Sequence, residues 1–179
     1  MGQIELGKPL AVEETPIPGF LRIDLTVHGD NRGWFKENWQ REKMLALGLP
    51  DFGPVQNNIS FNNEVGVTRG IHAEPWDKFV SVATGRVFGA WVDLREGPSF
   101  GAVYTCEIDP SVAVFVPRGV GNSYQTLEPD TAYTYLVNDH WSQGSAWIPR
   151  VTPTSLLKEM LFWTGPKSGK PSASIFSRC

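Results

Sequence analysis

Short apolar and aromatic runs, separated by turn residues, are the feature of this chain that most constrains its fold. The runs lie at 21–27, 79–83, 86–94, 102–108, 112–116 and 131–137, with turn signals such as Gly29-Asp30-Asn31 and Thr84-Gly85 between them. Many short strands at this spacing, without alternating helices, are typical of an all-β sandwich or barrel. One short helix is expected over about 39–47, because Gly48 and Pro50 supply a stop.

The domain organisation changes after Trp141. We expect one β domain over 1–141 and a divergent tail over 142–179. That tail carries one amphipathic helical pattern at about 154–163, with Leu156, Leu157, Met160 and Leu161 on one face. The chain of 179 residues carries enough apolar material for one sizeable core, since 41% of its residues are hydrophobic.

The charge and the chain ends exclude several classes of function. A net charge of -3 gives no electrostatic reason to expect nucleic acid or an anionic membrane as a partner. Two cysteines are too few for a disulfide framework. The N-terminal sequence does not have the pattern of a signal peptide, and no apolar run approaches the roughly 20 residues of a membrane span. The expectation is a soluble, cytoplasmic protein.

His72 stands in the densest group of chemically active side chains. Arg69, His72, Glu74 and Lys78 lie within ten residues and could converge at the mouth of a β scaffold. Taken by itself, this pattern fits a structural histidine on a solvated loop at least as well as a catalytic base. Tyr133 and Tyr135 alternate along one predicted strand and so share a face. Aromatic residues in this position most often pack in a core, although a tyrosine opposite a histidine could act as an acid.

A metal site is not predicted. Metal sites in small β-barrels commonly use two histidines one residue apart, a nearby carboxylate and a third histidine on a later strand. The segment here is His72-Ala73-Glu74, and Asn122 stands where the third histidine would be. Nucleophile-elbow, phosphate-loop and dinucleotide-binding fingerprints are also missing from the sequence.

Six motifs in order carry a family resemblance. They are Asp30-Asn31-Arg32-Gly33-Trp34-Phe35, Val55-Gln56-Asn57-Asn58-Ile59-Ser60, Arg69-Gly70-Ile71-His72, Lys78-Phe79-Val80, Val92-Asp93-Leu94-Arg95 with Pro98-Ser99-Phe100-Gly101, and Val116-Pro117-Arg118-Gly119. Over roughly 17–141 the chain resembles the dTDP-4-dehydrorhamnose 3,5-epimerase family, in particular the epimerase half of epimerase–reductase fusions. The resemblance implies a cupin-type jelly roll (a double-stranded β-helix) with a few short helices, a homodimer and no cofactor.

The resemblance also implies a reaction. Family members act on a dTDP-linked 4-keto-6-deoxy sugar in the synthesis of dTDP-rhamnose, a precursor of cell-wall polysaccharide. The C4 ketone acidifies the protons at C3 and C5, a base removes a proton, and a proton returns on the opposite face of the enolate. His72 matches the family's base, Tyr135 its acid, and Lys78 the cation near the enolate oxygen. The residues that match substrate contacts are Arg32 and Arg69 at the diphosphate, Phe35 beside the nucleotide, where in the family it reaches across the dimer, and Glu37, Gln56, Asn58, Asn122 and Trp141.

The chain departs from the family pattern at several positions. Asn122 replaces a common histidine, Gly89 a common aspartate, and Trp141 a tyrosine. The motifs end at Trp141, so the aspartate that orients the family's histidine has no match in 143–179. Asp93 and Glu74 are the candidate substitutes. Three hypotheses follow: an active epimerase, a dTDP-sugar-binding module with little or no turnover that works with a reductase partner of the same pathway, and a metal-dependent cupin enzyme.

Overall fold

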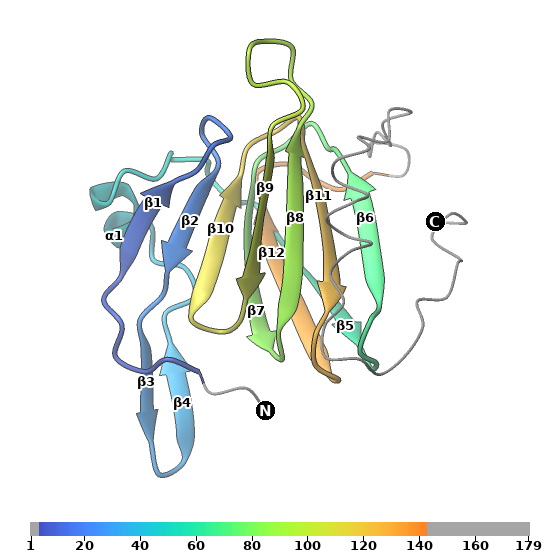
Figure 1. Cartoon of the computed structure of the whole chain (residues 1–179). Coiled ribbons are helices and arrows are strands. Elements are labelled where there is room, and N and C mark those ends of the chain that lie inside the picture. The colour runs from blue at the N-terminus through green and yellow to red at the C-terminus, as the bar shows by residue number, and fades with distance from the viewer. Residues whose placement is uncertain (1–3, 143–179) are drawn as a thin grey trace.

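Two antiparallel sheets face each other in the computed structural model, which describes residues 4–142 (Figure 1). The 6-stranded sheet has the order β1 (Ala11–Glu14), β2 (Leu21–Asp24), β10 (Val112–Val116), β7 (Lys78–Thr84), β12 (Thr131–Val137) and β5 (Gln56–Asn62). The 4-stranded sheet has the order β6 (Thr68–His72), β11 (Val120–Thr126), β8 (Val87–Asp93) and β9 (Val103–Ile108). A separate hairpin joins β3 (Val27–Asp30) to β4 (Gly33–Lys36), and the one helix in this part of the chain is α1 (Arg41–Ala46). The non-consecutive strand order makes this a cupin-type jelly roll, as expected.

Two apolar layers hold the larger sheet in place. Side chains that alternate along a strand point to opposite faces. In β7, Val80 and Val82 therefore belong to the core between the two sheets, where they meet Trp91 of β8. Phe79 points the other way and packs with Met44 of α1 in a second cluster. The sheet is therefore buried on both faces in its centre, which explains why all five residues of β10 are buried.

The sequence predicted most strands, with some errors in their limits. The run at 21–27 is two strands, β2 and the start of β3, rather than one. Residues 11–14, expected to be only an extended lead-in, form β1. Strands β5 and β6 carry polar and charged residues on their inward faces, which hid their strand character. The helix is confirmed as Arg41–Ala46, with the Gln40 side chain accepting a hydrogen bond from the backbone N of Lys43 at its start. The helix expected at about 154–163 lies outside the described residues.

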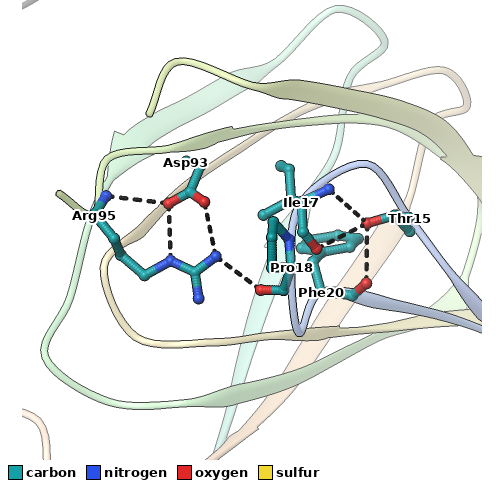
Figure 2. A network of polar contacts seen from close by, with 6 residues as sticks. All are labelled: Thr15, Ile17, Pro18, Phe20, Asp93 and Arg95. Atoms are coloured by element: carbon teal, nitrogen blue, oxygen red, sulfur yellow. Dashed lines mark hydrogen bonds and ion pairs between the residues drawn. The ribbon is translucent and has the colours of Figure 1, made fainter. Parts of the chain in front are cut away.

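A buried aspartate ties the N-terminal segment to the end of β8 (Figure 2). Asp93 is fully buried and accepts two hydrogen bonds from the Arg95 guanidinium, from Nε to Oδ1 at 2.8 Å and from Nη2 to Oδ2 at 2.7 Å, and one from the Arg95 backbone N to Oδ1 at 3.1 Å. The same guanidinium donates to the carbonyl of Pro18 at 2.7 Å. Thr15 closes the turn before β2 by donating to the carbonyl of Phe20 at 2.9 Å. The Asp93–Arg95 ion pair therefore connects the end of β8 to the segment that precedes β2.

An irregularity in β6 decides which side chains face the interior. Residues three apart in a regular strand point to opposite faces. The register of β6 shifts, however, so that His72 lies opposite Asn122 and Arg69 opposite Tyr124. A bulge of this kind places both Arg69 and His72 on the inward face. Gly70 sits at the irregularity with φ +106°, a conformation that favours glycine.

A helix long and apolar enough to cross a membrane does not occur within residues 4–142.

Gly70→Ala should strongly destabilise the protein and displace His72. A Cβ at this position would lie 2.5 Å from the carbonyl oxygen of Asn122 and 2.7 Å from the Ser123 Cβ. We expect a loss of about 3 kcal/mol in the free energy of unfolding, from backbone strain plus overpacking. Gly66→Ala is the matched control: it has φ +83° with open space around it, so it should cost only about 1 kcal/mol. Urea unfolding of both variants measures the difference, and equal losses would contradict the steric account.

Candidate active site

Polar side chains gather on the inward faces of five strands from the two sheets. Two contacts demonstrate the convergence. Lys78 Nζ of β7 lies 5.8 Å from the ring centroid of Tyr135 on β12, and Arg69 Nε of β6 donates to Asn62 Oδ1 of β5 at 2.9 Å. The side chains that share this interior are Gln56, Asn58 and Asn62 of β5, Arg69 and His72 of β6, Lys78 of β7, Asn122 and Tyr124 of β11, and Tyr133 and Tyr135 of β12.

His72 is half-buried and is held in its neutral form. Burial lowers the pKa of its imidazole, and the positive charges of Lys78 and Arg69 lower it further. All three effects disfavour the imidazolium, so the ring stays neutral below its ordinary pKa of about 6.5. A neutral imidazole in a cavity at neutral pH can accept a proton, which is the property a general base requires.

Lys78 is the most deeply buried cation of this cavity. Only 5% of the residue is exposed, and its ammonium makes an ion pair with Glu74, whose side chain is 9% exposed. Burial lowers the pKa of Lys78 to about 7. The Glu74 carboxylate acts in the opposite direction, because a nearby negative charge favours the ammonium.

The amide of Asn122 is fixed with its oxygen turned away from the cavity. Asn122 Oδ1 accepts hydrogen bonds from Trp91 Nε1 at 2.6 Å and from the Tyr133 hydroxyl at 3.2 Å. An indole nitrogen is a donor only, so the amide atom that meets it must be the oxygen. The amide nitrogen is thereby left as a donor next to His72, which lies directly opposite Asn122 in the sheet. The sequence marked Asn122 but not Trp91; the inward alternation along 87–93 is the signal that could have found it.

The two tyrosines of β12 share the inward face, as predicted, but their environments differ. Tyr133 is fully buried against Tyr124 in a stacked pair, with ring centroids 4.0 Å apart. Tyr135 is half-buried, and its ring lies 6.0 Å from that of Tyr133. Burial raises the pKa of the Tyr135 hydroxyl, and the neighbouring Tyr124 adds to the effect. Tyr135 is therefore protonated at neutral pH and can donate a proton. Tyr133 instead packs in the core, and its hydroxyl donates a hydrogen bond to Asn122.

Arg69 and the polar face of β5 line the opposite side of the cavity. Asn62 is buried and accepts a hydrogen bond from Arg69 Nε, while the terminal nitrogens of this guanidinium have no hydrogen-bond partner among residues 4–142. Gln56 donates to Asn58 Oδ1 at 2.7 Å and accepts from the backbone N of Trp141 at 3.2 Å. Trp141 is exposed beside this edge. These donors and acceptors suit a polar ligand.

Three predicted substrate contacts lie away from this cavity. Arg32 stands at the tip of the β3–β4 hairpin, where its side chain is 85% exposed and pairs with Asp30. Phe35, 65% exposed, and Glu37, which pairs with Lys43, border a separate cleft of about 320 Å³ next to α1. Figure 1 shows the hairpin and β6 on opposite sides of the molecule. Within one chain, Arg32, Phe35 and Glu37 therefore do not meet His72.

Neither candidate substitute for an orienting carboxylate serves His72. Asp93 is paired with Arg95, whose guanidinium also donates to the Pro18 carbonyl (Figure 2), and Glu74 is paired with Lys78. Within residues 4–142, the His72 imidazole makes no hydrogen bond with a protein group. The same residues contain no group of three or more His, Cys, Asp or Glu side chains that could hold a metal ion.

Replacing Arg69 by glutamine should raise the pKa of His72. The variant removes one of the two cations that lower this pKa, while Gln can still donate to Asn62. The midpoint of the His72 imidazole titration, followed by NMR, should move to higher pH. The resonances of His28, on the distant hairpin, should not move. An unchanged His72 midpoint in Arg69→Gln would show that Arg69 does not act on this histidine.

Comparison with known proteins places this site in a family. A family model described as dTDP-4-dehydrorhamnose 3,5-epimerase matches residues 14–153. A Streptococcus pyogenes protein named as an RmlC homolog is 57% identical over 141 residues, covering 75% of this chain and 71% of that protein. The structure of RmlC from Streptococcus suis in complex with dTDP-D-xylose has a TM-score of 0.74 at 56% identity, covering 77% and 74% of the two chains.

A more distant structure extends the similarity. RmlC from Legionella pneumophila, in complex with dTDP-4-keto-L-rhamnose, has a TM-score of 0.76 at 25% identity and covers 92% of this chain and 87% of that one. The family match also ends at residue 153, beyond the last sequence motif at Trp141, so the similarity extends further than those motifs indicated. The chain belongs to the dTDP-4-dehydrorhamnose 3,5-epimerase family.

Proposed function

We propose that the cavity around His72 epimerises C3 and C5 of dTDP-4-dehydro-6-deoxy-D-glucose, giving dTDP-4-dehydro-L-rhamnose. The observation that carries the proposal is that the His72 imidazole, the Tyr135 phenol and the buried Lys78 side chain, paired with Glu74, lie in one cluster. Family membership supplies the substrate class. The activity belongs to the synthesis of dTDP-rhamnose.

The reaction needs a base, an acid and a stabilised oxyanion. His72 takes the proton from the carbon next to the C4 ketone, and the electron pair of the C–H bond moves onto the C4 oxygen as an enolate. Lys78 stabilises that oxygen, since a cation in a water-poor cavity is worth several kcal/mol at a developing charge. Tyr135 returns a proton to the carbon on the face opposite His72, which inverts the centre. After His72 has released its proton to water and the Tyr135 phenolate has taken one up, the cycle repeats at the second carbon.

Substrate binding uses the remaining polar groups. The free terminal nitrogens of Arg69 suit a diphosphate, because guanidinium groups make bidentate contacts with phosphate oxygens. The fixed Asn122 amide donates to a sugar oxygen, and Gln56, Asn58 and Trp141 line the edge where the substrate enters. We assign Arg32, Phe35 and Glu37 to the site of a second copy in a homodimer, because they are exposed on a hairpin remote from their own His72. Cytoplasmic location and a reductase partner stay predictions.

His72→Ala and Tyr135→Phe should abolish proton exchange without abolishing binding. Solvent deuterium should enter C3 and C5 with the wild-type protein, measured by mass spectrometry or NMR of the sugar nucleotide. A positioned acid or base contributes about 10²–10⁴-fold, so each variant should lose at least about 100-fold. Tyr104→Phe is the matched control, because Tyr104 is a half-buried tyrosine of β9 that packs on Phe20 away from His72.

The same experiment separates epimerase from binding module. Calorimetry with dTDP should show binding to the wild type and to His72→Ala, and weaker binding to Arg69→Ala. Binding of dTDP with no deuterium uptake above the His72→Ala background would reject the epimerase hypothesis and support the dTDP-sugar-binding module. A stoichiometric, activity-supporting metal in the purified protein would instead favour a metal-dependent cupin enzyme.

Mixing two inactive variants tests the shared site. If the hairpin completes the cavity of a second copy, Arg32→Ala and His72→Ala should each exchange poorly alone. Refolding them together should restore exchange, because one site of the mixed dimer then has both groups. Arg118→Ala mixed with His72→Ala provides the control, since Arg118 pairs with Asp77 of its own chain. If Arg32→Ala keeps full activity by itself, Arg32 does not contact substrate.

A further inference from the structure

Glu74 is a buried carboxylate that the reaction described above does not use. Its Oε2 oxygen is shielded from solvent and has no hydrogen-bond partner within the described residues. The polar contact of this oxygen there is the ion pair with the Lys78 ammonium. The two side chains are 9% and 6% exposed. A buried carboxylate and a buried ammonium are each costly alone, and their proximity offsets part of the cost of both.

The segment that carries Glu74 is fixed on both sides. Its backbone carbonyl accepts a hydrogen bond from Gly119 N at 3.2 Å. Three residues later, Asp77 accepts from Arg118 and from Asn138, in the latter case at 2.9 Å from Nδ2 to Oδ2. These contacts join the 74–78 segment to the turn before β11 and to the end of β12. The Glu74 carboxylate is therefore held in place rather than free to rotate into solvent.

Among residues 4–142, the other groups around Lys78 give it no negative charge. On β12 it faces the Tyr135 ring at 5.8 Å, and its sheet partners there and on β10 are Val137 and Val116. On β6 it faces His72, and Arg69 stands beyond, a second cation in the same cavity. Since Asp77 is committed to Arg118 and Asn138, Glu74 is the carboxylate available to balance this ammonium.

We propose that Glu74 is a positioning residue, which holds the Lys78 ammonium in the cavity and keeps it charged where the enolate oxygen develops. The proposal rests on the proposed epimerase function for its catalytic meaning, but not for the ion pair itself. Glu74 does not touch the substrate; it acts through Lys78. A neutral amine at this position would still fill the space but would not stabilise an oxyanion.

The direct test follows the charge of Lys78 by NMR, without substrate. Lysine labelled with ¹³C at Cε gives a titration curve for each amine, and Lys78→Met identifies the resonance of interest. In the wild type, Lys78 should remain an ammonium well above pH 7. In Glu74→Gln, a neutral side chain of the same shape, its midpoint should fall by about one pH unit or more, because an adjacent opposite charge is lost. Glu74→Asp should retain most of the wild-type midpoint.

Two outcomes would overturn the proposal. One is an equal Lys78 midpoint in the wild type and Glu74→Gln. The other is a wild-type Lys78 that is already neutral at about pH 7, the value to which burial lowers its pKa. If Glu74→Gln does not fold, the double variant Glu74→Gln/Lys78→Met, which removes both charges, should fold. A double variant that fails while Lys78→Met folds would also reject the pairing role.

The activity measurement separates this proposal from the proposed function. In the deuterium assay, Glu74→Gln should lower kcat more than it weakens dTDP binding, and the alkaline limit of kcat should move to lower pH. Lys78→Arg, which is charged at all accessible pH values, should show no such shift when Glu74→Gln is added. A wild type without exchange would refute the epimerase yet leave the Lys78 titration to decide the role of Glu74.

Discussion

The inward faces of the strands change from apolar to polar along the barrel, and the site depends on that change. Val80 and Val82 of β7 fill the core, whereas Lys78, at the start of the same strand and on the same face, enters the cavity. Because side chains alternate strictly, one residue of slippage would place Phe79 in the cavity and Lys78 in the apolar outer layer. The two apolar layers therefore determine the register, and the register positions the chemistry.

The bulge in β6 is the exception that completes the cavity. Without it, Arg69 and His72 would point to opposite faces of the sheet. The left-handed conformation of Gly70 and its close approach to the Asn122 carbonyl exclude a side chain there. The same two strands thus position His72, the Arg69 guanidinium that lowers its pKa, and the Asn122 amide. Rigid sheet elements hold such groups more accurately than loops do.

Charge balance in the cavity is uneven, and this suits an anionic substrate. Lys78 and Arg69 face His72, and Glu74 offsets one of these two cations. The remaining positive charge lowers the pKa of the histidine and attracts a diphosphate. The protein as a whole carries a net charge of -3, so this attraction is local to the cavity. Arg32 at the exposed hairpin adds to it only if a second copy brings that hairpin to the cavity.

The sequence by itself determined the all-β class, the one described helix, most strands and the family, because hydrophobic periodicity and turn residues are local signals and ordered motifs are specific together. It also identified His72, Lys78 and Tyr135, which the structure brings into one cavity. Strands β5 and β6 and the residues Trp91 and Asn62 were not identified from the sequence as parts of the site, since polar inward faces carry no hydrophobic pattern. Only the tertiary structure showed that Asp93 forms an ion pair with Arg95, and Glu74 with Lys78. It also showed that three predicted substrate contacts lie far from His72 of the same chain: Arg32, Phe35 and Glu37. Those pairings join residues through strand order and a bulge, which spacing along the chain does not encode.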